Sequence, residues 1–268
     1  MISLKNLDFS YDNKNKILDN LNIDFGEQGQ IIGIVGPNGS GKSTIFKNIV
    51  ALEKPTSGFV QVDGVPIKYS KKGLFNLRSQ IGMVFQNADH QIFFSNVSED
   101  VSFVLKNLKY SKKQIGERLD WVFKELDMED IRDRPVQYLS GGQKRRVAIA
   151  GVMVMKPKWL LLDEPTTGLD FDGIKRMKNL IKQLMKNGQR FIISSHDMNF
   201  MYDICDYFYV IKGGSLLGKG TKQVVFENQE IMTQAQLEIP FIVKLHRKFG
   251  TELFENEEEL FNSQIKLR

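Results

Sequence analysis

Apolar and polar residues alternate along two stretches near the start of the chain, 2–11 and 17–25. A period of two residues is typical of strands with one covered face, so we predict an antiparallel pair. Three later runs are almost wholly apolar: 30–36 (QIIGIVG), 81–86 (IGMVFQ) and 159–164 (WLLLDE). Runs of this kind are typical of strands buried on both faces, as in a parallel sheet.

Helical periodicity appears between these strands and after them. Strand–helix alternation predicts an α/β fold with a parallel sheet covered by helices on both faces. A mostly helical block at about 88–155 interrupts that alternation and predicts an inserted lobe, and beyond about 222 the pattern is helical again. The predicted helices cover 42–52, 96–128 with a break near Tyr110, a helix opening at 140, and 171–187; further strands cover 58–64 and 189–195, with a glycine-turned hairpin at 207–220.

Composition and charge exclude few classes of protein. The 268 residues are 41% hydrophobic and 26% charged, with a formal net charge of +5 and a single cysteine, Cys205. One cysteine rules out an internal disulfide, which fits a reducing compartment. The opening residues alternate like a strand and lack the form of a signal peptide. No run reaches the roughly 18 apolar residues that span a bilayer, so we expect any service to a membrane to go through a partner.

A glycine-rich loop, GPNGSGKST at 36–44, fits the G-x-x-x-x-G-K-[ST] template between a predicted strand and a predicted helix. Glycines let backbone N–H groups turn inward around an anion, and the following helix adds its positive end. Lys42 would place its charge at the β- and γ-phosphates, and the Ser43 hydroxyl would ligate Mg²⁺. The residues predicted to bind ATP in this loop are Gly36, Asn38, Gly39, Gly41, Lys42, Ser43 and Thr44.

Two adjacent acids end the buried run at 159–164. A carboxylate at the C-terminal end of such a strand lies where ligands bind in open α/β sheets. We predict Asp163 as a partner of Mg²⁺, through water, and Glu164 as the general base that activates the attacking water. A solvated acidic turn is the simpler alternative. Two adjacent acids at the end of a buried strand are costly unless metal and water use them, and the phosphate loop elsewhere in the chain favours that use.

A second glycine-rich stretch, LSGGQ at 139–143, raises the question of a second anion site. Ser140 and Gln143 have the spacing of a capping box at the start of a helix, whose free N–H groups again favour an anion. The first loop already wraps one side of its nucleotide. Two-fold symmetry resolves the duplication if each chain's LSGGQ covers the nucleotide of the other chain.

GPNGSGKST, LSGGQ, WLLLDEP, GLD and SSHD occur in that order, and together they resemble the ATP-binding cassette (ABC) family of ATPases over about residues 1–220. The resemblance implies a RecA-like P-loop core with an antiparallel β subdomain and an inserted α-helical subdomain. It also implies hydrolysis of ATP with Mg²⁺ in a site shared by two cassettes. We therefore expect an ATPase domain at 1–222 and a short helical extension at 223–268.

The resemblance also assigns residues that their own surroundings in the sequence do not. Tyr11 would stack on adenine, and Asp170 would belong to the loop that links the two sites. Gln86 would sense Mg²⁺ and the attacking water and couple to a membrane partner, and His196 would hold the γ-phosphate. Ser140, Gly142 and Gln143 would contact ATP across the dimer. The implied catalytic set is Lys42, Gln86, Glu164 and His196, and the implied magnesium ligands are Ser43, Gln86 and Asp163.

The stretch QNADHQIFFSNVSEDVSF at 86–103 resembles a segment of energy-coupling-factor importers, and departs from it at Ala88, His90 and Asn96. LEIPFIVKLHRKFG at 237–250 resembles the C-terminal segment where their two cassettes dimerise. The implied function is uptake of cobalt, nickel or a vitamin, with cobalt first. The implied partners are a membrane coupling subunit that docks on 87–100, a substrate-binding membrane subunit, and an identical or paralogous cassette at the cytoplasmic face of the membrane.

A soluble ABC ATPase acting on nucleic acid or ribosomes is the alternative function. Such relatives usually have a long coiled coil inside the cassette, or two cassettes in one chain. This sequence has one phosphate loop and a short insertion, and its basic residues lack the interleaved aromatics of a nucleic-acid surface. We therefore expect no nucleic-acid partner.

Overall fold

The chain divides into two units, Met1–Ser70 with Phe191–Arg268 and Lys71–Arg190. The computed structural model describes residues 1–26 and 28–263. Because each unit is held by its own core, the two are described in turn.

Unit 1, the first of these, contains the predicted antiparallel pair. β1 (Ile2–Phe9) and β2 (Leu18–Phe25) pair from Ile2 opposite Phe25 to Phe9 opposite Leu18. β4 (Ser57–Val62) and β5 (Val65–Pro66) extend this sheet, in the order β2-β1-β4-β5. The alternation of the sequence is therefore confirmed as the pattern of a sheet with one buried face.

The apolar run at 30–36 forms β3 (Ile31–Val35), all five residues of which are buried. β8 (Arg190–Ser194) and β9 (Tyr207–Lys212) flank it in parallel, and β10 (Ser215–Thr221) pairs antiparallel with β9 through the predicted glycine turn. The helices of unit 1 are α1 (Lys42–Ile49), α7 (Met198–Ile204), α8 (Lys222–Phe226), α9 (Gln229–Gln234), α10 (Phe241–Phe249) and α11 (Glu257–Asn262).

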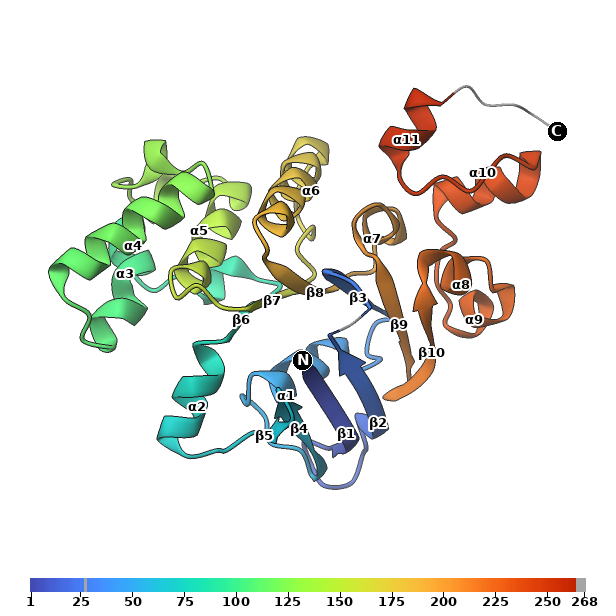
Figure 1. Cartoon of the computed structure of the whole chain (residues 1–268), viewed down its shortest axis with the longest axis horizontal. Coiled ribbons are helices and arrows are strands. Elements are labelled where there is room, and N and C mark those ends of the chain that lie inside the picture. The colour runs from blue at the N-terminus through green and yellow to red at the C-terminus, as the bar shows by residue number, and fades with distance from the viewer. Residues whose placement is uncertain (27, 264–268) are drawn as a thin grey trace. The chain divides into compact units, whose positions relative to one another are not determined.

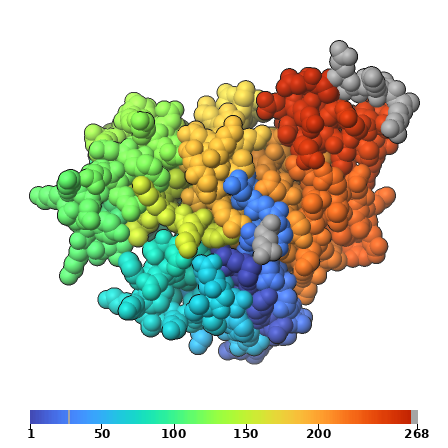
Figure 2. Space-filling model, viewed as in Figure 1, coloured from blue at the N-terminus to red at the C-terminus, as the bar shows by residue number. Residues whose placement is uncertain are grey.

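Three side chains on one face of α7 hold the C-terminal helices by their backbone. Asn199 accepts a hydrogen bond from the N–H of Phe241 at 2.7 Å, and Asp203 accepts one from Glu257 at 3.2 Å. The hydroxyl of Tyr202 donates to the carbonyl of Phe254 at 2.9 Å. Pro240, the N-cap residue of α10, makes no side-chain cap hydrogen bond, so Asn199 supplies that cap from another helix. In Figure 2 these C-terminal residues (red) adjoin the orange residues of the same unit.

Unit 2 contains a parallel pair of strands, β6 (Ile81–Val84) and β7 (Trp159–Asp163), and a group of packed helices. α3, α4 and α5, green to yellow-green in Figure 1, lie together and share an apolar core. The helices of unit 2 are α2 (Lys71–Arg78), α3 (Val97–Asn107), α4 (Lys112–Glu125), α5 (Gly141–Met153) and α6 (Phe171–Lys186), with short 3₁₀ turns at Ala88–His90, Glu129–Ile131 and Val136–Tyr138.

Capping residues fix the starts of these helices. Asn96 caps α3 by accepting hydrogen bonds from the N–H groups of Ser98 and Glu99. Ser140 and Gln143 form the predicted capping box at the start of α5, since each side chain bonds the other residue's backbone. α2 is a helix that the sequence analysis missed. It is only eight residues long, and its apolar residues Leu74, Phe75 and Leu77 span about one turn, which is too short to establish a helical period in the sequence.

Gly82 in β6 and Gly116 in α4 offer a matched test of the packing in unit 2. A Cβ on Gly82 would lie 2.0 Å from a methyl carbon of Val152 in α5, whereas a Cβ on Gly116 has no neighbour within 4 Å. We expect Gly82→Ala to lower the free energy of unfolding by about 1–3 kcal/mol through overpacking. Gly116→Ala, by contrast, should raise it by about 0.5–1 kcal/mol, because alanine favours the helix.

The measurement is urea unfolding followed by tryptophan fluorescence. Both tryptophans of the chain, Trp121 and Trp159, belong to unit 2, so the signal reports on this unit. Equal shifts of the two variants in the same direction would contradict the packing of β6 against α5.

Candidate functional site

The phosphate loop joins β3 to α1 in unit 1. Gly39 and Gly41 have φ angles of 78° and 101°, a region that side chains with a Cβ rarely adopt. A Cβ on Gly36 would lie 2.1 Å from the carbonyl oxygen of Ile211, so this position also requires glycine. Gly41 caps α1 with no side-chain bond to its first N–H groups. The loop therefore presents backbone donors and a helix N-terminus to an anion.

Lys42 curls back over this loop. Its ammonium group donates to the carbonyl of Gly36 at 2.8 Å and to that of Pro37 at 3.0 Å, and the side chain is buried. Ser43, the next residue, is exposed. The hydroxyl of Ser40 is buried without a hydrogen-bond partner among the described residues. A buried cation, an open hydroxyl and an unpaired polar group around a ring of N–H donors fit a bound polyphosphate.

Tyr11 lies in the loop after β1, and its ring is 56% exposed. Its hydroxyl is 3.5 Å from the Thr44 hydroxyl and from the Lys47 ammonium group, so the ring lies over the start of α1. Phe9 supports it edge-on, with ring centroids 4.7 Å apart. An exposed aromatic face beside the phosphate loop is suited to stacking on a base.

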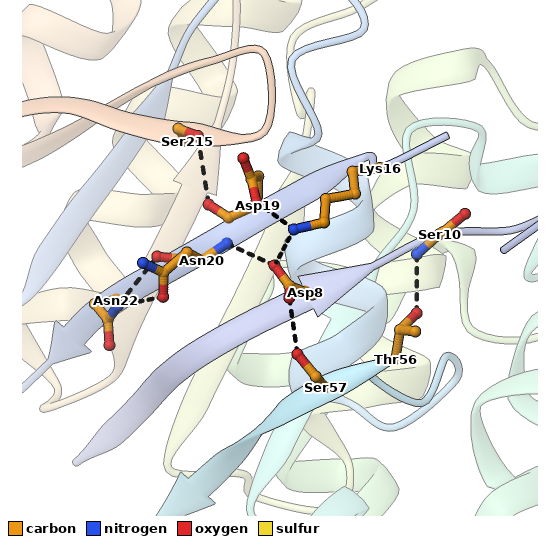
Figure 3. Close-up of polar contacts among 9 residues, drawn as sticks. All are labelled: Asp8, Ser10, Lys16, Asp19, Asn20, Asn22, Thr56, Ser57 and Ser215. Atoms are coloured by element: carbon orange, nitrogen blue, oxygen red, sulfur yellow. Dashed lines mark hydrogen bonds and ion pairs between the residues drawn. The ribbon is translucent and has the colours of Figure 1, made fainter. Parts of the chain in front are cut away.

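A polar network centred on Asp8 links β1, β2 and β4, and so holds the two strands that the Tyr11 loop connects (Figure 3). The Asp8 carboxylate accepts hydrogen bonds from the Asn20 N–H at 2.7 Å and the Ser57 hydroxyl at 2.8 Å. Lys16, in the Tyr11 loop, lies 3.4 Å from Asp8 and 2.6 Å from Asp19. Hydrogen bonds to its charged form lower the pKa of Asp8. The sequence analysis missed this residue, because the two-residue alternation of β1 gives no sign of its partners.

His196 lies at the same edge of the sheet as the phosphate loop. Ile34 of β3 pairs with Ser194 of β8, so the loop and His196 both follow the C-terminal ends of neighbouring parallel strands. The imidazole is exposed. Asp197 caps α7 immediately after it, accepting a hydrogen bond from Phe200 at 3.0 Å. Unit 1 thus brings together three of the predicted elements: Tyr11, the phosphate loop and His196.

The predicted acid pair ends β7 in unit 2. Asp163 is 4% exposed and Glu164 7% exposed. Glu164 has a φ of 49°, in the left-handed region where a residue with a long side chain is strained. The turn continues with a hydrogen bond from the Thr167 N–H to the Glu164 carbonyl at 3.2 Å. Asp170 then caps α6 by accepting from Gly173 at 2.7 Å.

LSGGQ opens α5 in unit 2. Neither Gly141 nor Gly142 has a positive φ. A Cβ on Gly141 would have no neighbour within 4 Å, and one on Gly142 would reach a single methyl carbon at 3.9 Å. Neither backbone geometry nor packing within the chain requires these glycines. They leave the N-terminus of a 13-residue helix open to close approach by something outside it, which suits an anion held by a partner.

Gln86 follows β6 in unit 2 and is exposed. The side chain of Gln91 stabilises the backbone that precedes Gln86. It accepts a hydrogen bond from the Phe85 N–H at 2.7 Å and donates one to the Met83 carbonyl at 3.0 Å. Asp100 accepts from the N–H groups of Phe93 and Phe94 at 2.8 and 3.1 Å. Burial raises the pKa of Asp100, and these two hydrogen bonds oppose the rise.

A cavity of about 480 Å³ in unit 2 lies between the segment after Gln86, the start of α5 and the turn after Glu164. Arg145 and Lys144 line it from α5. Neither residue was among the site residues predicted from the sequence. The sequence gives no signal for Arg145, because α5 is buried at successive positions from Val147 to Ala150 and has no single apolar face.

Comparison with known proteins identifies the family. The family described as ABC transporter matches residues 18–167. Among curated relatives, the cobalt import ATP-binding protein CbiO of Salmonella typhimurium is 41% identical over 266 residues, which cover 99% of this chain and 97% of that protein.

Solved structures agree with these matches. CbiO1 of Clostridium perfringens, described as part of the ABC transporter complex cbiONQ, has a TM-score of 0.79 and 38% identity, over 92% of this chain and 94% of that one. An ATP-binding cassette solved as a dimer with ADP and phosphate has a TM-score of 0.72 and 29% identity, over 82% and 98%. The chain therefore belongs to the ABC transporter family, as an ATP-hydrolysing cassette similar to the ATP-binding subunits of cobalt importers.

Proposed function

We propose that this ATPase powers an importer of the energy-coupling-factor type, with cobalt as the cargo. The observation that carries the proposal is the match to a cobalt import ATP-binding protein along 99% of this chain, together with an exposed aromatic surface in the segment that resembles the docking region of such importers. No helix among residues 1–26 and 28–263 has the length and apolar character needed to cross a membrane. We propose that the chain works with membrane partners, since CbiO1 is described as part of the ABC transporter complex cbiONQ.

The docking segment, residues 87–100, has the properties of a surface that receives a partner. Phe93 is 75% exposed, and Phe94 packs against Phe103 with ring centroids 5.1 Å apart. The hydrogen bonds of Asp100 fix the backbone that presents these rings. Ordered, exposed aromatics mark protein interaction sites more often than a solvated surface. We propose that a helix of the membrane subunit packs here.

For hydrolysis, we propose that the loop 36–44 and Lys42 bind the phosphates of ATP and that Tyr11 stacks on the adenine. His196 would hold the γ-phosphate, and Glu164 would accept the proton of the attacking water in an in-line displacement. The oxygen donors Ser43, Asp163 and Gln86 are of the kind that binds Mg²⁺, which offsets phosphate charge when bound. Ser140, Gly142 and Gln143 would contact the ATP of a second cassette, and Asp170 would lie where the two sites connect.

The dimer in this proposal rests on the open glycines of α5 and on the dimeric cassette that the chain resembles. We propose that α10 and the rest of the extension add to the contact between cassettes, because Phe241, Phe249 and Phe261 are exposed on these C-terminal helices. The second cassette would be a copy of this chain or a paralogue.

The general-base role predicts the outcome of Glu164→Gln. Glutamine keeps the size of the side chain and cannot accept the proton, so we expect kcat to fall by at least about 100-fold. ATP binding should persist, because the phosphate loop is untouched, and dimers should accumulate with ATP. Phosphate release and gel filtration with ATP measure the two effects. Release of phosphate near the wild-type rate would contradict the role of Glu164.

The importer itself is tested by co-purification from the native cell. We expect the tagged chain, extracted gently from membranes, to bring an integral membrane subunit, identified by mass spectrometry. Phe93→Ser should reduce the recovery of that subunit severalfold while the ATPase rate of the isolated chain is unchanged, since Phe93 lies outside the nucleotide-binding residues. Phe59→Ser, which changes an exposed phenylalanine of unit 1, is the matched control.

One outcome would overturn the importer assignment, and another would overturn the docking role alone. Recovery of the chain with ribosomes or DNA, and without a membrane protein, would favour the soluble alternative. Equal recovery of the membrane subunit with Phe93→Ser and with wild type would remove the docking role of 87–100. A co-purified substrate-binding membrane protein that retains cobalt would support cobalt as the cargo.

A further inference from the structure

Arg145 is a buried cation in unit 2, which also contains Gln86, Glu164 and LSGGQ. Its side chain is 5% exposed, although it stands five residues after the exposed Ser140. Burial lowers the pKa of its guanidinium group, and the charge of Asp163 opposes that shift. A cation is retained in such a position only where its donors are used, because desolvation of the charge is otherwise costly.

The guanidinium group uses its two terminal nitrogens on two different loops. Nη1 donates to the carbonyl of Phe85 at 3.3 Å, and Nη2 donates to the carbonyl of Thr167 at 3.2 Å. The planar fork of arginine reaches two acceptors at once, which the single ammonium group of lysine does not do with the same geometry. Arg145 therefore joins α5 to both loops.

Each of these carbonyls lies beside a residue with a proposed role. Phe85 immediately precedes Gln86 and the docking segment. Thr167 belongs to the turn whose first residue is Glu164, and its N–H bonds to the Glu164 carbonyl at 3.2 Å. Glu164 has a φ of 49°, and contacts within this turn hold its backbone in that left-handed conformation.

Lys144, the neighbouring residue, makes a second connection. Its ammonium group lies 2.7 Å from the carboxylate of Asp89, in the docking segment. This pair is partly exposed and solvent screens it, so it contributes little to stability alone. It nevertheless ties α5 to the docking segment directly, and Lys144, Asp89 and Arg145 line the same cavity.

We propose that Arg145 is a positioning residue that fixes Gln86 and the Glu164 turn to the start of α5. When a partner displaces the docking segment, the Glu164 carboxylate, which activates water, and the LSGGQ helix then move together with it. This inference rests on the proposed function. It adds the means by which docking and hydrolysis are linked within unit 2. In this proposal Arg145 acts through the carbonyls of Phe85 and Thr167 and has no direct contact with ATP.

The experiment compares Arg145→Lys and Arg145→Met in the full-length chain. We expect the dissociation constant for ATP to stay within about twofold to threefold of wild type, since the phosphate loop belongs to unit 1. We expect kcat to fall roughly tenfold to hundredfold, as for a misplaced catalytic group, with the lysine variant falling less than the methionine variant. The concentration of Mg²⁺ that gives half-maximal activity should rise, because Gln86 and Asp163 are less well placed.

Arg118→Met is the matched control. Arg118 also donates to a backbone carbonyl of unit 2, that of Val154 at 3.4 Å, and it lies outside the loops that carry Gln86 and Glu164. The control should keep the wild-type kcat and Mg²⁺ dependence while losing a comparable contact. Rates are expressed per chain able to bind ATP, so that unfolded protein does not count. If Arg145→Met does not fold, Arg145→Lys decides the question, since it keeps the charge and the aliphatic stem.

A wild-type kcat and Mg²⁺ dependence in Arg145→Lys would overturn the inference, and so would a loss of rate that matches the control. The proposed chemistry fails separately, if Glu164→Gln remains active. An inactive Glu164→Gln combined with a normal Arg145→Lys would remove the positioning role alone.

Discussion

The arrangement of both units depends on one electrostatic requirement. The negative charge of a polyphosphate has to be met by donors already in place, because flexible side chains lose conformational entropy when they are fixed around it. Backbone N–H groups at helix N-termini satisfy this requirement at low cost. The chain presents two such ends, at Gly41 and at Ser140, each at the start of a helix with glycines beside it.

The two ends reach this state in different ways. Around Gly41 the glycines are demanded by the chain itself, through positive φ angles and the close approach of Ile211 at Gly36. Around Ser140 the capping box satisfies the helix start, and Gly141 and Gly142 have open space in place of a side chain. The glycines of the first loop are therefore required by its own backbone conformation, whereas those of LSGGQ leave space beside the helix N-terminus.

Sequence patterns predicted the elements that have a strong local signal. The buried strands, the capping box at Ser140 and the antiparallel pair at the start follow from apolar runs, S-x-x-Q spacing and two-residue alternation. α2 did not, because its eight residues are too few to establish a helical period. The roles of Asp8, Gln91 and Arg145 depend on partners that are distant along the chain, or that are backbone groups with no identity in the sequence. Such contacts are set by tertiary structure, so local patterns carry no trace of them.

The way α7 holds the C-terminal helices has a consequence for the exchange of parts between related proteins. From the sequence, the segment that follows residue 222 was expected to be a separate helical extension. Yet the first N–H of α10 is satisfied by Asn199, and Tyr202 and Asp203 bond the backbone further along. In a chimera that joins residues 1–222 of one protein to the extension of another, the side chains of α7 and the backbone groups of the extension would lose their hydrogen-bond partners. Asn199, Tyr202 and Asp203 must therefore be inherited together with the helices they hold, and the extension and the histidine-bearing end of β8 form one unit of exchange.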